Sequence, residues 1–297
     1  MTVASLAAPI VLVYGGAARR RRSARSAPVT SFILRCLAAV ALAALTFAGA
    51  ASAAERRVVV ADPAPPLAGA TTAGPLTGYL SMPSGAGPFP AVALIHSCLG
   101  LPENRAAFAA TLVGWGYVAL FVDEFAPRGL EETCSVDFPV GPADAAAALA
   151  YLARQPFVDA KRVAVVGFSQ GGDVALALAA SPPRGMRLRA AASYYPPCAN
   201  RQGETLTVPT LILVGAADSV TPSADCRALV AAQPPGAAAA RLVVLPGAGH
   251  LFDDPDSAGG RVVLGMRFAY DGAAAARAEQ ELRRFLAKTL SQTAEGD

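Results

Sequence analysis

The chain has 297 residues, of which 54% are hydrophobic and 16% are charged, a charged share well below the usual value of about 25%; this excludes an intrinsically disordered protein. Its 27 glycines and 24 prolines follow no three-residue repeat, which excludes a collagen-like chain. The formal charge is +3, but residues 1–53 hold six arginines and no acidic residue, so residues 54–297 carry −3 and lack the basic surplus that nucleic-acid binding needs.

The first 53 residues have the layout of a secretory signal peptide. A run of arginines, Arg19–Arg22, precedes an apolar stretch from Phe32 to Ala50, and Ala51-Ser52-Ala53 follows as a small-x-small cleavage site. We predict cleavage after Ala53, which leaves residues 54–297 as a single domain in the periplasm or outside the cell. An uncleaved membrane anchor is the alternative, because the segment from Leu37 to Ala54 is close to the minimum length of a span.

After the leader, short β-rich runs alternate with alanine-rich helical stretches. The predicted strands are Arg57–Val60, Thr77–Met82, Ala91–Ile95, Tyr117–Val122, Arg162–Val166, Ala190–Tyr194, Thr210–Val214 and Arg241–Leu245. The predicted helices are Glu103–Trp115, Ala143–Arg154, Gly171–Ala180, Ser223–Ala232 and Ala273–Leu290. Several strands are continuously apolar, as expected of strands buried on both faces. The alternation predicts an α/β fold in which helices cover both faces of a mostly parallel sheet of about eight strands.

A candidate nucleophile lies in Gly167-Phe168-Ser169-Gln170-Gly171-Gly172, between a predicted strand and a predicted helix. This is the G-x-S-x-G pattern in its strand-turn-helix setting, where the serine is exposed on a sharp turn and small flanking residues let strand and helix approach. A phosphate-binding loop is the alternative for a glycine-rich turn, but its G-K-[ST] and G-x-G-x-x-G signatures are missing here. We therefore predict Ser169 as the nucleophile of a hydrolase.

Serine needs a base, and the chain has two histidines. His250 lies in a glycine-rich loop after a late strand, where it can reach a nucleophile at the carboxyl edge of the sheet. His96 ends an earlier strand, in a loop better suited to an oxyanion hole. We predict His250 as the base, with a surface-loop histidine as the alternative.

Asp218 is the predicted acid, because it follows the apolar run TLILVGAA directly. The order Ser169, Asp218, His250 is that of α/β-hydrolases. The alternative candidates for the acid are Asp253, Asp254 and Asp225, but their positions are more typical of carboxylates in loops or helix caps.

The backbone N–H groups of Gln170 and Cys98 are the predicted oxyanion hole. Removal of the leader leaves four cysteines, an even number that suits an oxidising compartment. Of the three possible pairings, Cys98 with Cys134 and Cys198 with Cys226 is our hypothesis, and four small buried thiols are the alternative. No C-x-x-C pair is present, so we expect no metal site and no cofactor.

Several of these segments resemble the dienelactone hydrolase family, a branch of the α/β-hydrolases. The matching pieces are H-S-C-L-G-L from His96, F-V-D-E-F-A-P-R-G ending at Gly129, G-F-S-Q-G-G from Gly167, L-I-L-V-G-A-A-D-S-V-T-P around Asp218, P-G-A-G-H-L-F-D around His250, and the stretch that begins at Tyr270. The resemblance covers nearly all of the mature chain. Family members are known for a cysteine where this chain has Ser169 and a glutamate where it has Ser97, so the resemblance implies the hydrolase scaffold rather than dienelactone as the substrate.

The resemblance also implies that Arg128 and Ser97 contact the substrate, with a solvated loop arginine as the alternative for Arg128. Taken together, the sequence predicts a secreted or periplasmic serine hydrolase that cleaves a small-molecule ester, thioester or lactone through an acyl-enzyme. Acyl transfer or peptide cleavage by the same triad is one alternative. A noncatalytic binding protein on the same fold is another.

Overall fold

The computed structural model describes residues 55–62, 64, 67, 72, 74–135, 137–263 and 266–291. The chain divides into two units, residues 1–50 and residues 51–297, and all described elements belong to the second unit. The predicted leader and its cleavage site lie outside the described residues.

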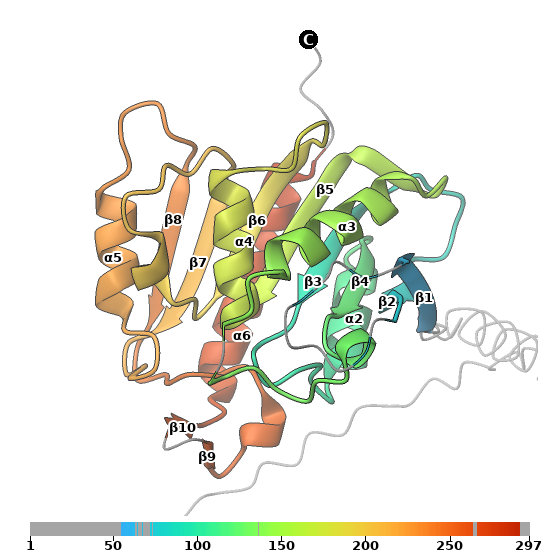
Figure 1. Cartoon of the computed structure of the whole chain (residues 1–297). Coiled ribbons are helices and arrows are strands. Elements are labelled where there is room, and N and C mark those ends of the chain that lie inside the picture. Colours follow the sequence, from blue (N-terminus) through green and yellow to red (C-terminus); the bar gives the residue numbers. More distant parts are fainter. Residues whose placement is uncertain are drawn as a thin grey trace, which may run out of the picture. The chain divides into compact units, whose positions relative to one another are not determined.

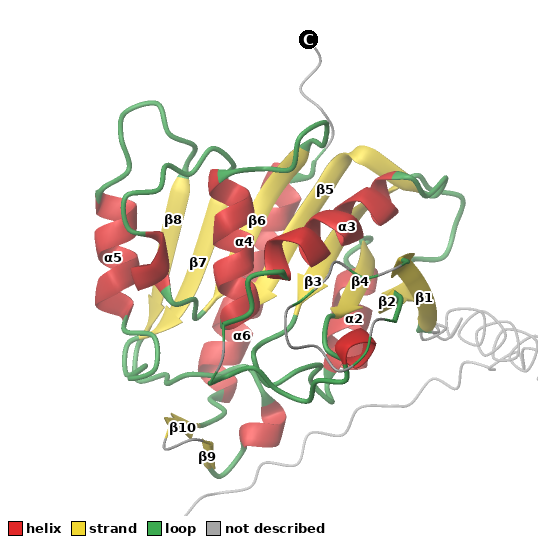
Figure 2. Ribbon diagram, in the orientation of Figure 1, coloured by secondary structure: helices red, strands yellow, loops and turns green. Residues whose placement is uncertain are grey.

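Eight strands form one mixed sheet at the centre of this unit (Figures 1 and 2). In chain order they are β1 (Arg56–Ala61), β2 (Leu76–Ser81), β3 (Phe89–Ile95), β4 (Val118–Asp123), β5 (Val158–Phe168), β6 (Leu188–Tyr194), β7 (Thr210–Gly215) and β8 (Ala240–Leu245). Their spatial order is β1-β2-β4-β3-β5-β6-β7-β8. The pairs β1–β2 and β2–β4 are antiparallel and the others parallel, which confirms the predicted sheet.

Helices cover both faces of the sheet. They are α2 (Arg105–Gly114), α3 (Gly141–Ala153), α4 (Gln170–Ala180), α5 (Ser223–Ala231) and α6 (Gly272–Thr289). Figure 1 shows α3, α4 and α5 in front of the sheet and α2 and α6 behind it. All eight predicted strands and all five predicted helices are present within a few residues of their predicted bounds.

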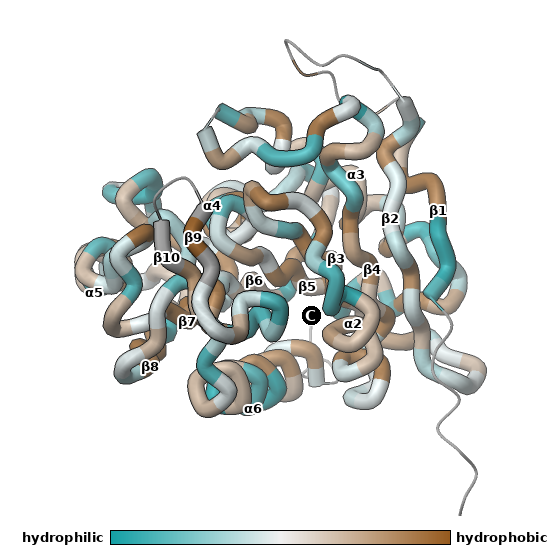
Figure 3. Tube along the Cα trace, turned by 90° about the horizontal axis from the view of Figure 1, so that it is seen from below, coloured by the Kyte–Doolittle hydropathy of each residue, from teal (hydrophilic) through white to brown (hydrophobic). Residues whose placement is uncertain are grey.

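Strand alternation separates the core into two layers. In β3, Val92 and Leu94 belong to the hydrophobic cluster that includes side chains of α2 and α6, whereas Ala91, Ala93 and Ile95 point to the opposite face and belong to the cluster that includes side chains of α3 and α4. Both sets are fully buried, which explains why the AVALI run is continuously apolar rather than alternating. Figure 3, a view from below Figure 1, shows the apolar strands between these helices.

The sheet has a topological switch point between β3 and β5. The chain passes from β3 through α2 to β4 on one side, and from β5 through α4 to β6 on the other. Because these connections leave in opposite directions, a crevice forms at the carboxyl ends of the two strands, where α/β proteins bind their ligands. The loop that begins at His96 and the turn at Ser169 both start there.

Two features were not predicted. Strand β5 begins at Val158, four residues before the predicted start, because its first half carries the polar segment Asp159–Arg162, which hides the strand pattern. A hairpin of β9 (Arg261–Val263) and β10 (Met266–Phe268) was missed because strands of three residues are too short to show a periodicity.

The structure has both disulfides of the favoured pairing, Cys98–Cys134 and Cys198–Cys226. The second joins the short 3-10 helix η2 (Cys198–Arg201) to α5, and both of its cysteines are buried. The bond closes a loop across 28 positions of sequence, which restricts the unfolded chain.

We expect the double substitution Cys198→Ala/Cys226→Ala to lower the free energy of unfolding by about 3 kcal/mol, because the unfolded chain regains the entropy of this loop. Equilibrium unfolding in guanidinium chloride measures the change. An unchanged midpoint with an unchanged denaturant slope would show that the bond adds no stability.

Candidate active site

Ser169 lies at a sharp turn between β5 and α4. Its φ of 52° and ψ of −112° are sparsely populated by residues other than glycine. The turn is tight: a Cβ on Gly167 would lie 1.8 Å from the carbonyl oxygen of Gly171, and one on Gly171 would lie 2.3 Å from that of Ile95. As predicted, glycine is needed at these two positions, because the backbone segments approach each other too closely to leave room for a Cβ atom.

Three polar side chains form a continuous relay at this turn. The Oγ of Ser169 is 3.0 Å from Nε2 of His250, and Nδ1 of His250 is 2.8 Å from Oδ2 of Asp218. With the ring proton on Nδ1 facing the carboxylate, Nε2 is free to accept the serine proton. The structure thus brings together the three residues singled out as nucleophile, base and acid.

Asp218 is held in place by its own loop. Backbone N–H groups of Val220 and Thr221 donate to Oδ1 at 2.9 and 2.8 Å, and the Thr221 hydroxyl lies 2.9 Å from Oδ2. Burial raises the pKa of Asp218, but the hydrogen bond and charge of His250, together with the bonds from Thr221, outweigh it and leave the pKa below its ordinary value. The carboxyl is therefore ionised at neutral pH, as a partner for an imidazolium requires.

Thr221 is a site residue that the sequence analysis missed. Its hydroxyl also lies 3.1 Å from the Tyr195 carbonyl oxygen and 3.1 Å from Nδ1 of His250. It thus links the loops after β6 and β7 to the histidine. The only signal was its position three residues after Asp218.

The histidine ring packs between aromatic side chains. Its centroid is 4.6 Å from that of Tyr195 and 5.6 Å from that of Phe268 in β10. Among the described non-glycine residues, positive φ occurs at Ser169, Tyr195 and Leu251, all within this site. Clustered backbone strain of this kind is typical of functional sites.

The two N–H groups predicted as an oxyanion hole belong to the crevice between β3 and β5. Gln170 is the first residue of α4, and Cys98 lies in the loop after β3. Within the described ranges, neither N–H has a hydrogen-bond acceptor in the protein. The segment with Thr133 connects them: its N–H donates to the Cys98 carbonyl oxygen, its hydroxyl donates to Oε1 of Gln170, and the adjacent Cys134 is bonded to Cys98.

Ser169 opens into two adjoining spaces. A small cavity toward the histidine is lined by Ser97, Leu99 and Phe268 among others. A wide groove on the other side is lined by Cys98, Thr133, Gln170, Asp173, Pro197 and Thr221 among others. Ser97, one of the two predicted substrate contacts, lines the small cavity, and its Oγ accepts the Leu99 N–H at 3.2 Å.

The rival carboxylates have other partners. Asp253 accepts a hydrogen bond from the Tyr195 hydroxyl at 2.7 Å, and Asp254 accepts from the Asp256 N–H and the Ser257 hydroxyl. Asp225 lies in the first turn of α5. None of the three is hydrogen-bonded to His250 in the described part of the structure.

His96 fixes the shape of the loop that carries Cys98. Its Nδ1 donates to the Ser97 carbonyl oxygen at 2.7 Å, and its Nε2 accepts the Glu124 N–H at 3.3 Å. Burial lowers the pKa of His96 to about 4, so the ring is neutral at neutral pH. Burial, with the Asp144 charge added, raises the pKa of Glu124 well above its ordinary value. His96 therefore has the contacts of a loop-holding residue.

Arg128, the other predicted substrate contact, is buried in an ion pair. Its Nη1 and Nη2 donate to the two carboxylate oxygens of Asp144 at 2.8 and 2.9 Å, and Nη1 also donates to the Glu124 carbonyl oxygen. The side chain is 2% exposed and is not among the residues that line the two spaces beside Ser169. These contacts favour a structural role, and substrate binding by Arg128 stays a prediction.

Within the described ranges, no cluster of three or more His, Cys, Asp and Glu side chains is arranged to hold a metal ion. Over the same residues, no helix is both long and apolar enough to cross a membrane.

The chain is similar to proteins of a known family. The model of the Dienelactone hydrolase family matches residues 76–290. The chain therefore belongs to the dienelactone hydrolase family, and its fold is the α/β-hydrolase fold. An uncharacterized protein of Mycobacterium tuberculosis, Rv2307c, is 32% identical over 211 residues, which are 64% of this chain and 72% of that protein. Esterase FrsA of Escherichia coli is 36% identical over 117 residues, or 35% of this chain and 25% of the esterase.

Solved structures share the fold. A dienelactone hydrolase-like promiscuous phosphotriesterase, P91, from metagenomic libraries has a TM-score of 0.64 at 24% identity, over 80% of this chain and 99% of that one. A putative dienelactone hydrolase from Klebsiella pneumoniae has a TM-score of 0.59 at 22% identity, over 79% of this chain and 99% of that one. Membership in this family supports an ester hydrolase.

The buried, neutral side chain of His96 makes the stability of the folded protein sensitive to acid. Unfolding exposes the ring, and its pKa returns from about 4 to 6.5. Between these two pH values the unfolded chain therefore binds a proton that the folded protein does not bind. The free energy of unfolding thus falls as the pH drops from 6.5 to 4. We expect the stability advantage of the wild type over His96→Gln to shrink by about 2–3 kcal/mol between pH 7.5 and 4.5. Urea unfolding of both proteins measures it.

The comparison with the variant is needed because the raised carboxyl pKa values of Glu124 and Asp144 act in the opposite sense in both proteins. A stability difference that does not vary with pH would mean that His96 has an ordinary pKa in the folded state.

Proposed function

We propose that this protein is a serine hydrolase that cleaves a carboxylic ester, thioester or lactone through an acyl-enzyme intermediate. The observation that carries the proposal is the hydrogen-bonded relay from Ser169 through His250 to Asp218, beside the N–H groups of Cys98 and Gln170. Membership in a family of ester hydrolases supports the same reaction class.

In the acylation step, His250 removes the Ser169 proton through Nε2 while Oγ bonds to the substrate carbonyl carbon. The negative charge moves to the carbonyl oxygen, which accepts hydrogen bonds from the N–H groups of Cys98 and Gln170 in this proposal. The imidazolium then gives its proton to the leaving oxygen or sulfur as the bond to the carbonyl carbon breaks. Asp218 stabilises the imidazolium without taking its proton.

In the deacylation step, water enters from the open groove and loses a proton to His250 as it attacks the acyl carbon. The second tetrahedral intermediate uses the same N–H groups. His250 returns the proton to Oγ of Ser169 as the ester bond breaks and the acid departs. Each step needs the histidine on one side of the serine and the N–H groups on the other.

The proposed enzyme acts in an oxidising compartment outside the cytoplasm. The two disulfides suit such a location, and the leader of residues 1–53 supplies the route. Expression of the full chain in a bacterium with a secretory pathway should yield exported protein whose N-terminal sequence starts at Ala54. Exported protein that still contains Arg35 would refute processing at this position.

We expect Ser169→Ala to lower kcat/KM for activated esters by about 10³-fold or more, because the substitution removes the atom that forms the acyl bond. A panel of p-nitrophenyl esters, thioesters and lactones measures this, with circular dichroism to verify that the variant is folded. A fluorophosphonate probe should add one adduct to the wild type and none to the variant.

Ser181→Ala is the matched control, because this exposed serine lies at the end of α4 and lines neither space at Ser169. It should still take up the probe. Labelling that persists in Ser169→Ala would refute the nucleophile, and a folded wild type that neither labels nor turns over any ester would point to a binding protein.

A further inference from the structure

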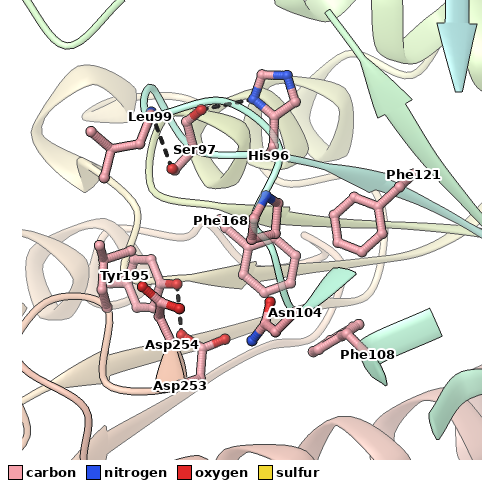
Figure 4. Close-up of a pocket in the computed structure, with 12 residues that line it drawn as sticks. His96, Ser97, Leu99, Asn104, Phe108, Phe121, Phe168, Tyr195, Asp253 and Asp254 are labelled. Carbon is pink, nitrogen blue, oxygen red and sulfur yellow. Dashed lines mark hydrogen bonds between the residues drawn. The ribbon is translucent and has the colours of Figure 1, made fainter. Parts of the chain in front are cut away.

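A further cavity adjoins the small cavity at Ser169 and has no role so far. Ser97, Leu99 and Leu251 line both this cavity and the small one at Ser169, so the two spaces share walls. The rings of Phe108, Phe121 and Phe168 form its apolar side, with Phe108 and Phe168 packed edge to face at 5.2 Å between centroids. We call it the aromatic cavity (Figure 4).

The opposite side of the aromatic cavity is polar. The Tyr195 hydroxyl donates to Oδ1 of Asp253 at 2.7 Å, a bond that fixes the direction of the carboxyl group (Figure 4). Asp254 also lines the cavity, but both of its oxygens accept hydrogen bonds from the 3-10 turn that follows it. Asn104 lines the cavity as well, and its amide has no hydrogen-bond partner among the described residues.

The described lining of the cavity has a negative charge with no positive counterpart. Neither arginine nor lysine is among the residues that line it, and within the described chain Asp253 forms no ion pair. His96, which also lines it, is neutral. Asp253 is partly buried, and a carboxylate that loses part of its hydration without gaining a cation is stabilised when a positive group binds beside it. A substrate carboxylate would be repelled here.

A compact cation fits these features. Carboxylates attract an ammonium group directly, and the faces of aromatic rings attract it through their quadrupole. We propose that the aromatic cavity binds a positively charged ammonium group of the substrate, held between the Asp253 carboxylate and the phenyl rings. This rests on the proposed function, because the cavity matters for turnover only if Ser169 attacks the carbonyl of the same molecule.

The pH dependence of such binding has a defined sign. Burial raises the pKa of Asp253 to about 6, against the lowering effect of the Tyr195 hydrogen bond, and the Asp254 charge raises it further. The groups that face it are Tyr195 and Tyr194 from the end of β6 and Asp254 from its own loop. The carboxyl is thus ionised above pH 6 and loses its charge below, so the preference for a cation should fade as the pH falls through 6.

The test compares isosteric esters that differ only in charge. For the acyl side we choose p-nitrophenyl 4-(trimethylammonio)butanoate and p-nitrophenyl 5,5-dimethylhexanoate, and for the alcohol side acetylcholine and 3,3-dimethylbutyl acetate. The readout is the ratio of kcat/KM for the cationic ester to that for the neutral ester, each divided by its hydroxide-catalysed rate. In one of the two series we expect a ratio of about 10 or more at pH 8.

Asp253→Asn keeps an acceptor for the Tyr195 hydroxyl and removes the charge, so it should lower this ratio toward one. The exposed Asp256→Asn is the matched control: it removes a carboxylate from the same loop but not from the cavity lining, and it should keep the ratio. In the wild type the ratio should fall between pH 7 and 5. Because both esters need the same catalytic base, its contribution is common to both rates and cancels from the ratio.

A ratio near one in both series, or a ratio that Asp253→Asn leaves unchanged, would overturn the inference. If Asp253→Asn does not fold, the wild-type pH dependence decides, and a ratio constant from pH 8 to 5 would overturn it. Ser169→Ala separates this result from the proposed function. Hydrolysis of the neutral ester that depends on Ser169, with no cation preference, refutes only the ammonium site, whereas hydrolysis that survives Ser169→Ala refutes the proposed function.

Discussion

The backbone conformation of Ser169 is the constraint on which the site depends. A positive φ at a serine costs of the order of 1–3 kcal/mol and persists only where surrounding structure enforces it. Here β5 is fixed between β3 and β6, and α4 packs closely enough that Gly167 and Gly171 leave no room for a Cβ. The strained turn lifts the hydroxyl above the carboxyl edge of the sheet, where loops from other strands can reach it.

The partners of Ser169 come from loops that are far apart in sequence and are tied together by tertiary bonds. Thr221 links the loop of Asp218 to the end of β6, and Phe268 in the β9–β10 hairpin packs on the His250 ring. On the other side, the Cys98–Cys134 disulfide and Thr133 hold the loop after β3 against Gln170. The loop that carries His250 and the loop after β3 are thus each held by their own tertiary contacts, which would supply the preorganisation that the proposed ester cleavage requires.

The ionisation state of each buried titratable group around the site follows from its burial and its neighbours. Arg128 and Asp144 neutralise each other as a bidentate pair, and His96 is neutral because burial removes its proton at neutral pH. Asp218 is ionised because His250 and Thr221 favour its charge. The partly buried Asp253 differs from all of these, since among the described residues it has a hydroxyl partner but no cation, and it lines a cavity that adjoins the small cavity at Ser169.

The sequence by itself determined the order and type of the elements, since apolar runs buried on both faces and alanine-rich helices are local patterns. It also determined the tight turn at Ser169, because only small residues fit there. The tertiary structure decided what depends on distance between loops: that Asp218 rather than Asp253 meets His250, that Thr221 supports both, and that Arg128 is enclosed by Asp144. Spacing along a chain contains no such distances, because the loop conformations that set them arise only when the sheet is assembled.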